Sequence, residues 1–192
     1  YGMMGMGAQS GGEKGIMRER AYKMEHLSGW DDQPPTEYFT ELFRVSVNQI
    51  IWGGNYFALP PTREVICWDK CQPFWNFSAW EMGWTSFCGV TKMFKFDNRT
   101  GGKIHPTQKP VALYKWLLTN YAKQGDTILD THLGSGSSRI ASYDLGFDFV
   151  GIEKDCDYFN AQEERFANHI AQARLFEPVE IEPVAEQSQL FI

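Results

Sequence analysis

The sequence predicts an α/β fold with a mostly parallel, twisted sheet and helices on both of its faces. The stretch 127–155 carries this prediction, because two short apolar runs within it end in the acidic residues Asp130 and Glu153. Between the runs lie a turn that contains Gly134 and Gly136 and a segment with helical periodicity. This order is typical of the strand–turn–helix–strand unit from which parallel sheets are built.

The remaining elements follow from apolar periodicity and from residues that start or stop helices. Apolar runs at 48–54 and 64–70 predict buried strands, and the first ends in two glycines, at the edge where ligands sit in open α/β sheets. Helices are predicted from Thr36, over 111–123, from about Ser137 to a cap at Gly146, and from about Asp155 to Phe176. We expect residues 1–29 to form a long loop and residues 177–192 a disordered acidic tail.

The glycine turn has features of a nucleoside site. Backbone N–H groups at the start of a helix are unpaired and can meet polar ligand atoms, and glycines let a ligand approach closely. Glu153 stands where the acid of a dinucleotide fold accepts hydrogen bonds from ribose hydroxyls. Asp130 would repel a pyrophosphate and favours a cationic or zwitterionic ligand such as S-adenosylmethionine. A lone Gly-x-Gly also occurs in turns that bind nothing, so both interpretations stay open.

The charge distribution says more than the total charge. The chain has 192 residues and a net charge of −6, but without the four glutamates of the tail the net charge is −2. Residues 71–104 interleave aromatic with basic residues, a composition that suits contact with phosphates and unstacked bases. The basic residues are Lys92, Lys95, Arg99 and Lys103. The alternative is that the aromatic residues form core and the lysines a solvated face.

Other features of the sequence narrow the class of protein. The four cysteines lack zinc-ligand spacing, and we interpret them as free thiols that pack as small apolar residues in a reducing cytoplasm. The four histidines are scattered and indicate no metal site. No apolar run approaches membrane-spanning length, and no secretory signal is visible. A cytoplasmic protein is therefore expected.

Three motifs follow one another in a specific order. They are His105-Pro106-Thr107-Gln108-Lys109-Pro110, Asp130-Thr131-His132-Leu133-Gly134-Ser135-Gly136-Ser137 and Gly151-Ile152-Glu153. Together they resemble the β class of DNA amino-methyltransferases, which use S-adenosylmethionine to methylate the exocyclic nitrogen of adenine or cytosine. The resemblance covers most of residues 48–170 and implies a Rossmann-like class I methyltransferase fold with a circularly permuted motif order, in a bacterial or phage-encoded protein.

The resemblance also implies roles for individual residues. The cofactor pocket would be lined by Asp130, Leu133, Gly134, Ser135 and Gly136. Glu153 would hold the ribose, and Thr107 and Lys109 would lie near the methionine moiety. Tyr1-Gly2 matches the end of the family's Asp/Ser-Pro-Pro-Tyr motif, so Tyr1 would stack on a base flipped out of double-stranded DNA. We expect residues upstream of Tyr1 to supply the rest of that motif and a central strand.

By the same resemblance, the chain divides into a catalytic half (1–70), a target-recognition segment (71–104), a cofactor half (105–176) and the tail. Adenine-N6 methylation is the leading hypothesis; cytosine-N4 methylation, or a catalytically incomplete remnant that binds cofactor or DNA, is the alternative. Gln187-Ser188-Gln189-Leu190-Phe191 resembles the short peptide by which replication proteins dock on the sliding clamp. The recognition sequence, a restriction partner and the oligomeric state, a homodimer included, stay open.

Overall fold

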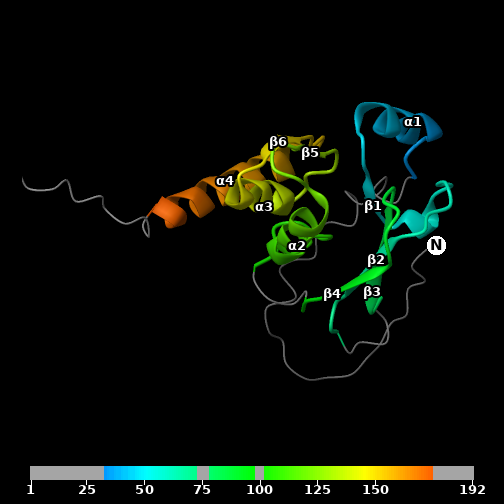
Figure 1. Cartoon of the computed structure of the whole chain (residues 1–192). Coiled ribbons are helices and arrows are strands. Elements are labelled where there is room, and N and C mark those ends of the chain that lie inside the picture. Colours follow the sequence, from blue (N-terminus) through cyan, green and yellow to red (C-terminus); the bar gives the residue numbers. More distant parts are fainter. Residues whose placement is uncertain (1–32, 73–77, 98–101, 175–192) are drawn as a thin grey trace, which may run out of the picture. The chain divides into compact units, whose positions relative to one another are not determined.

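The computed structural model describes residues 33–72, 78–97 and 102–174 (Figure 1). The chain divides into two compact units, 1–45 and 46–192. The described element of the first unit is α1 (Thr36–Val45), which begins at the predicted threonine and has no buried residue. The loop predicted near the start of the chain and the acidic tail lie outside the described residues.

The second unit contains a sheet of four strands in the order β1-β3-β2-β4. These strands are β1 (Ile50–Trp52), β2 (Val65–Asp69), β3 (Trp80–Thr85) and β4 (Lys92–Lys95), and η2 (Gly54–Tyr56) is a short 3-10 helix after β1. β3 is antiparallel to both β1 and β2, whereas β2 and β4 pair in parallel, so the sheet is mixed. The carboxyl ends of β1, β2 and β4 consequently lie at one edge. β1 and β2 confirm the two predicted strands.

Helix α2 (Val111–Tyr121) covers one face of this larger sheet. The core between them consists of Ile66 and Trp68 from β2 and Leu113 and Leu117 from α2, all of them buried. Removing four such side chains from water is the main source of stability for this packing. Figure 1 shows α2 between the sheet and α3, and α2 packs against both.

A second sheet pairs β5 (Thr127–Asp130) with β6 (Asp148–Gly151) in parallel. Helix α3 (Ser137–Leu145) makes the crossover between the two strands, and α4 (Cys156–Arg174) follows β6. Gly146 ends α3 with φ of 74°, so the predicted glycine cap is confirmed. The α/β class is likewise confirmed, with a parallel strand pair and a helical crossover at the position that the sequence indicates.

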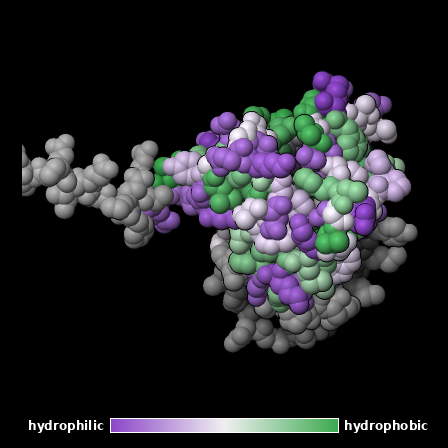
Figure 2. Space-filling view, in the orientation of Figure 1, coloured by the Kyte–Doolittle hydropathy of each residue, from purple (hydrophilic) through white to green (hydrophobic). Residues whose placement is uncertain are grey.

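Three further observations concern exposed hydrophobic residues, membrane-spanning helices and the cysteines. Figure 2 shows hydrophobic residues at the surface over β5 and β6, where Leu129, Val150 and Ile152 are exposed. No helix in the described part of the chain is long and apolar enough to cross a membrane. The cysteines are free thiols, but the expectation that they are buried is wrong for three of them, because only Cys67 is partly covered.

The predicted boundary between a catalytic half and a target-recognition segment falls at residue 70, inside the larger sheet. β2 lies before that boundary, and its two neighbours β3 and β4 lie after it. The sequence predicts no element at β3 or β4, since the periodicity of that segment is weak. The division into functional parts stays a prediction.

Candidate functional site

A loop between β5 and α3 places two glycines in left-handed backbone conformations. We call residues 130–138 the glycine loop; in it φ is 52° at Gly134 and 70° at Gly136. The Gly134 N–H donates to Glu153 Oε2 at 2.7 Å, and the Gly136 N–H donates to the Leu133 carbonyl at 2.9 Å. The loop therefore depends on positive φ values and on the carboxylate that follows β6.

Asp130 fixes the start of the same loop. Its Oδ1 accepts a hydrogen bond from the His132 N–H at 3.0 Å, and its Oδ2 accepts one from Ser138 Oγ at 2.5 Å. The side chain thus ties the end of β5 to the first turn of α3. Residues 133–138 are all buried, so the backbone of the loop is well packed.

Helix α4 packs against the loop through Arg165 and Gln162. Arg165 Nη1 donates to the Ser135 carbonyl at 2.6 Å and to Ser137 Oγ at 2.9 Å, and burial lowers the pKa of this arginine. Gln162 is fully buried, and a Cβ on Gly136 would lie 3.0 Å from its Oε1. The glycine is required there both by its φ and by this close approach.

The His105–Lys109 segment adjoins the loop at Gly134. A Cβ on Gly134 would lie 3.4 Å from the His105 ring, which also makes an edge contact with Tyr158 at 4.5 Å between centroids. Thr107 N–H donates to His105 Nδ1 at 3.3 Å. Burial lowers the pKa of His105, Glu153 acts in the opposite direction, and Lys109 lowers it further. Glu153 and Lys109, two of the predicted cofactor-binding residues, therefore both act on the His105 ring.

Lys109 belongs to an ion-pair cluster that we call the lysine bridge, made of Lys70, Glu81 and Lys109. Lys70 Nζ lies 2.6 Å from Glu81 Oε1, and Lys109 Nζ lies 3.2 Å from Glu81 Oε2. The two ammonium groups lie over tryptophan rings, that of Lys70 over Trp68 at 5.7 Å and that of Lys109 over Trp52 at 5.5 Å. Burial of Glu81 opposes ionisation, but the two lysines outweigh it and hold the pKa of Glu81 below its usual value.

Strand alternation explains why the bridge forms. Glu81 lies directly across from Trp68 in the β2–β3 pair, so both side chains point to the same face of the sheet. Lys70, two residues after Trp68, points to that face too. This is the face that α2 covers, and Lys109 directly precedes Pro110, after which α2 begins.

Tyr114 connects the two parts of the site. Burial raises the pKa of its phenol, and the negative charges of Asp130 and Glu81 raise it further. One carboxylate of the glycine loop and one of the lysine bridge therefore both act on this phenol electrostatically. The His105–Lys109 segment joins the two parts, because His105 lies against Gly134 and Lys109 pairs with Glu81.

Three of the four residues predicted to contact DNA lie in the part of the chain that the structure describes, and their surroundings differ. Lys92 lies 3.7 Å from Glu64 and over the Tyr121 ring at 4.3 Å, so its ammonium group already interacts with two side chains of the fold. Lys95 is 67% exposed and 3.8 Å from Asp69. Burial lowers the pKa of the partly buried Lys103, Lys70 lowers it further and Glu81 acts in the opposite direction, so Lys103 adjoins the bridge. Arg99 lies outside the described residues.

The structure brings together the predicted cofactor residues Lys109, Asp130, Leu133, Gly134, Ser135, Gly136 and Glu153, with Thr107 attached through the His105 ring. Tyr1, the predicted catalytic residue, lies outside the described residues. Sequence reasoning missed Lys70, Glu81, Gln162 and Arg165. Of these, only Lys70 had a signal, since it is the last residue of a predicted strand.

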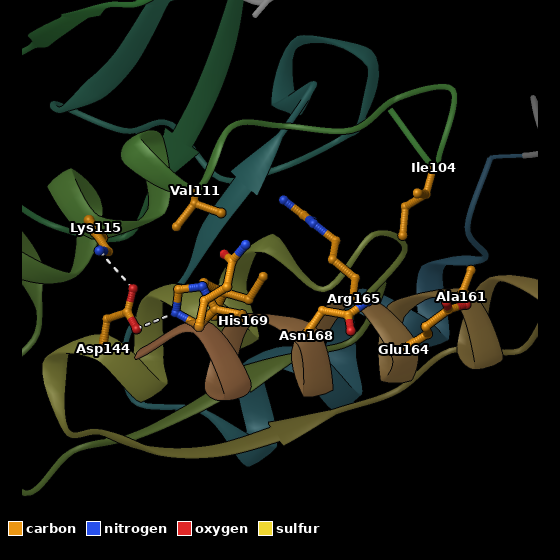
Figure 3. Close-up of a pocket in the computed structure, with 11 residues that line it drawn as sticks. Ile104, Val111, Lys115, Asp144, Ala161, Glu164, Arg165, Asn168 and His169 are labelled. Atoms are coloured by element: carbon orange, nitrogen blue, oxygen red, sulfur yellow. Dashed lines mark hydrogen bonds and ion pairs between the residues drawn. The ribbon is translucent and has the colours of Figure 1, made fainter. Parts of the chain in front are cut away.

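A cavity of about 630 Å³ lies between α2, α3 and α4. Figure 3 shows Arg165, Asn168 and His169 lining it from α4 and Asp144 bonded to both Lys115 and His169. These two ion pairs measure 2.7 Å and 2.6 Å. None of the predicted cofactor residues lines the cavity, although two of its lining residues, Ile140 and Arg165, bond to the glycine loop, so it is distinct from the predicted cofactor site.

Comparisons with known proteins agree with these motifs. The family model described as DNA methylase, of the N6/N4 type, matches residues 74–164. The type II methyltransferase M2.MboI of Moraxella bovis is 26% identical over 161 residues, which are 79% of this chain and 52% of that protein. M.HinfI of Haemophilus influenzae is 31% identical over 145 residues, 62% of this chain and 38% of that protein. The chain thus spans about half the length of these relatives or less.

Two solved structures align with this chain as well. A putative DNA modification methylase from Thermus thermophilus aligns with a TM-score of 0.47 and 17% identity, over 78% of this chain and 82% of that chain. The M1.HpyAVI–SAM complex aligns with a TM-score of 0.46 and 23% identity, over 54% of this chain and 61% of that chain. The match to residues 74–164 and the two curated relatives make the chain similar to N6/N4 DNA methylases, in agreement with its motifs.

Proposed function

We propose that this protein transfers a methyl group from S-adenosylmethionine to the exocyclic N6 amine of an adenine flipped out of double-stranded DNA. The observation that carries the proposal is the glycine loop with Glu153 bonded to its Gly134 N–H, placed at the carboxyl ends of β5 and β6. Type II methyltransferases with related sequences support the same reaction class.

The residues of the site fit the proposed cofactor. Glu153 accepts one N–H on each oxygen, from Gly134 and from Asp155, and each oxygen keeps a second lone pair for a ribose hydroxyl. Lys109 offers an ammonium group for the carboxylate of the methionine moiety, and Asp130 places a negative charge beside the loop, which suits a cationic sulfonium. Bound S-adenosylmethionine would supply an electrophilic methyl group.

The role of this chain is then to bind and orient the cofactor and to exclude water from it. Its loop backbone is held by Asp130, Arg165 and Glu153, so the loop needs no rearrangement when a ligand arrives. The His105 ring covers Gly134 and restricts access of solvent to the loop. In the proposed reaction Tyr1 stacks on the flipped base and recovers part of the cost of unstacking it, about a few kcal/mol.

Methyl transfer to DNA tests the proposal directly. The protein is incubated with methyl-labelled S-adenosylmethionine and duplex DNA, and the DNA is digested to nucleosides for mass analysis. N6-methyladenine is the expected product. N4-methylcytosine would move the target to the other base of this family, and cofactor binding without any methylated nucleoside would instead favour a protein that binds without turnover.

Two matched variants test the role of the loop. Glu153→Gln keeps the size of the side chain but removes the charge that faces the ribose, and we expect cofactor affinity to fall about tenfold or more. Glu164→Gln removes a charge from an exposed position of α4 and should leave cofactor affinity unchanged. Equal affinities for the two variants would contradict the assignment of Glu153 as the ribose ligand.

A further inference from the structure

The lysine bridge contains two residues, Lys70 and Glu81, to which the proposed function gives no role. Glu81 holds one ammonium group on each carboxylate oxygen, at 2.6 Å and 3.2 Å. In the described part of the chain it is the only carboxylate that pairs with either lysine. The three side chains therefore carry one net positive charge.

This charge lies where little water reaches it. The side chain of Lys70 is 12% exposed and that of Lys109 is 16% exposed. Uncompensated charge is costly in such surroundings, and the two tryptophan faces offset only part of that cost. Each ammonium group has three N–H donors, so both retain donors beyond those that Glu81 accepts.

The position of the bridge also points to a ligand. Lys70 follows the carboxyl end of β2, and Trp52, which lies under Lys109, ends β1. In open α/β sheets this edge is where ligands bind. Surplus donors and surplus positive charge at a ligand edge suit an oxyanion.

We propose that Lys70 and Lys109 form a subsite for an oxyanion, with Glu81 as the positioning residue that sets the spacing of the two ammonium groups. This inference rests on the proposed function, because two groups of that chemistry would then reach this edge. One is the carboxylate of the cofactor's methionine moiety, and the other is a phosphate of the DNA backbone. Both are oxyanions that two separated ammonium groups can share.

A pair of methionine variants tests the subsite. Lys70→Met removes one ammonium group from the bridge, and Lys115→Met removes one from the Asp144 ion pair at 2.7 Å, away from the bridge. Calorimetric titration with S-adenosylmethionine and fluorescence titration with a labelled duplex give the two affinities. We expect Lys70→Met to lose about tenfold in one of them, and Lys115→Met to lose less than about twofold in either.

The arms of this experiment identify the ligand. Weaker cofactor binding with unchanged DNA binding assigns the subsite to the methionine carboxylate. Weaker DNA binding, with a salt dependence reduced by about one phosphate contact, assigns it to the backbone. Both affinities unchanged in Lys70→Met would overturn the subsite. If Lys70→Met does not fold, as judged by circular dichroism, Lys70→Gln takes its place with the same expected loss.

Glu81→Gln tests the positioning role by the sign of its effect. The substitution raises the net positive charge of the bridge. If Glu81 were only a counter-ion of the lysines, Glu81→Gln would therefore bind the oxyanion more tightly than the wild type. A positioning residue would leave it bound more weakly, by about fivefold or more, because the lysines lose their fixed spacing. Tighter binding in Glu81→Gln overturns this role. A wild-type protein that binds neither ligand defeats the proposed function itself, whereas wild-type binding that survives Lys70→Met defeats only the subsite.

Discussion

The glycine loop and the lysine bridge adjoin the two ends of the same segment, His105–Lys109, yet different interactions hold them. The loop is fixed by hydrogen bonds that involve its own backbone, such as those of Gly134 with Glu153 and of Ser135 with Arg165. The bridge is fixed by two ion pairs between side chains. One half of the site is therefore defined by backbone geometry and the other by charge.

This difference determines how each half should respond to change. A buried loop with positive φ values has no room for additional atoms, but it is little affected by salt, because hydrogen bonds to backbone groups are not screened as exposed charges are. A cluster held by ion pairs between side chains responds to the loss of a charge and to pH more than to changes of size. The predictions below test this contrast.

The largest effect is expected for Gly136→Ala. Its φ of 70° disfavours alanine by about 1–2 kcal/mol, and the new Cβ would lie 3.0 Å from Gln162 Oε1, so we expect a total loss of about 3 kcal/mol in the free energy of unfolding. Gly146→Ala is the matched control, because its φ is 74° but nothing lies within 4 Å of the added Cβ. Urea unfolding measures both, and equal losses would show that the packing against Gln162 is unimportant.

Arg165→Met should have the next largest effect. It removes the two hydrogen bonds to Ser135 and Ser137, and we expect a loss of about 2 kcal/mol in the free energy of unfolding and weaker cofactor binding. The loss should be the same at low and at high salt, since both partners are neutral. Arg63→Met, at an exposed position, should not shift the unfolding midpoint. A loss for Arg165→Met that disappears in high salt would contradict the contrast between loop and bridge.

A smaller, pH-dependent effect is expected in the larger sheet from Glu64. Burial opposes its ionisation, but Tyr121 Oη and the Gly89 N–H, each at 2.7 Å, together with Lys92, hold the pKa of Glu64 below its usual value. A carboxyl with a lowered pKa in the folded state binds fewer protons there than when unfolded. Its contribution is present above the unfolded pKa of about 4.3 and is lost as the pH falls through the folded pKa.

Glu64→Gln should therefore cost about 1–2 kcal/mol near pH 7, where wild-type Glu64 is ionised. Below about pH 4.3 the difference between wild type and variant should shrink, because the wild-type carboxyl becomes neutral as well. Urea midpoints measured from pH 7 to pH 3 give this difference directly. A difference that does not change with pH would mean that the charge of Glu64 adds nothing to the fold.

The same contrast explains which parts of the site the sequence could predict. The glycine loop, α3 and the cap at Gly146 follow from local signals, namely glycines at fixed spacing, an acid at the end of an apolar run and helical periodicity. Each of these acts within a few residues. The identity of Glu153 as a partner of the loop was equally accessible, because the acid ends the next strand of the same unit.

The lysine bridge could not be predicted in this way. Its members meet only because β3 pairs antiparallel with β2 in the register that sets Glu81 across from Trp68. The sequence of β3 alternates too weakly to reveal a strand, and a shift of one residue would turn Glu81 to the opposite face. Arg165 and Gln162 were missed for a related reason, since the packing of α4 on the loop is a tertiary contact with no local signature.

The smallest effect concerns the lysines predicted to contact DNA, and it separates two that the sequence treats alike. Lys95 is 67% exposed and 3.8 Å from Asp69, whereas Lys92 lies against the buried Glu64 and the Tyr121 ring. We expect Lys95→Ala to leave the free energy of unfolding unchanged within about 0.5 kcal/mol, because exposed ion pairs contribute little. Lys92→Ala should destabilise the fold by about 1 kcal/mol or more, because it removes the cation beside a buried carboxylate.

For DNA the order should reverse. Lys95→Ala is expected to weaken duplex binding about threefold and to reduce the salt dependence by about one contact, the behaviour of a lysine that meets a phosphate. Lys92→Ala should leave the salt dependence of the folded protein unchanged, because its charge already serves Glu64. Titrations of a labelled duplex at several salt concentrations measure both slopes. A reduced salt dependence for Lys92→Ala but not for Lys95→Ala would mean that the DNA reaches the cluster of Lys92, Glu64 and Tyr121. The contrast between charges that stabilise the fold and charges that bind a ligand would then be wrong for these two lysines.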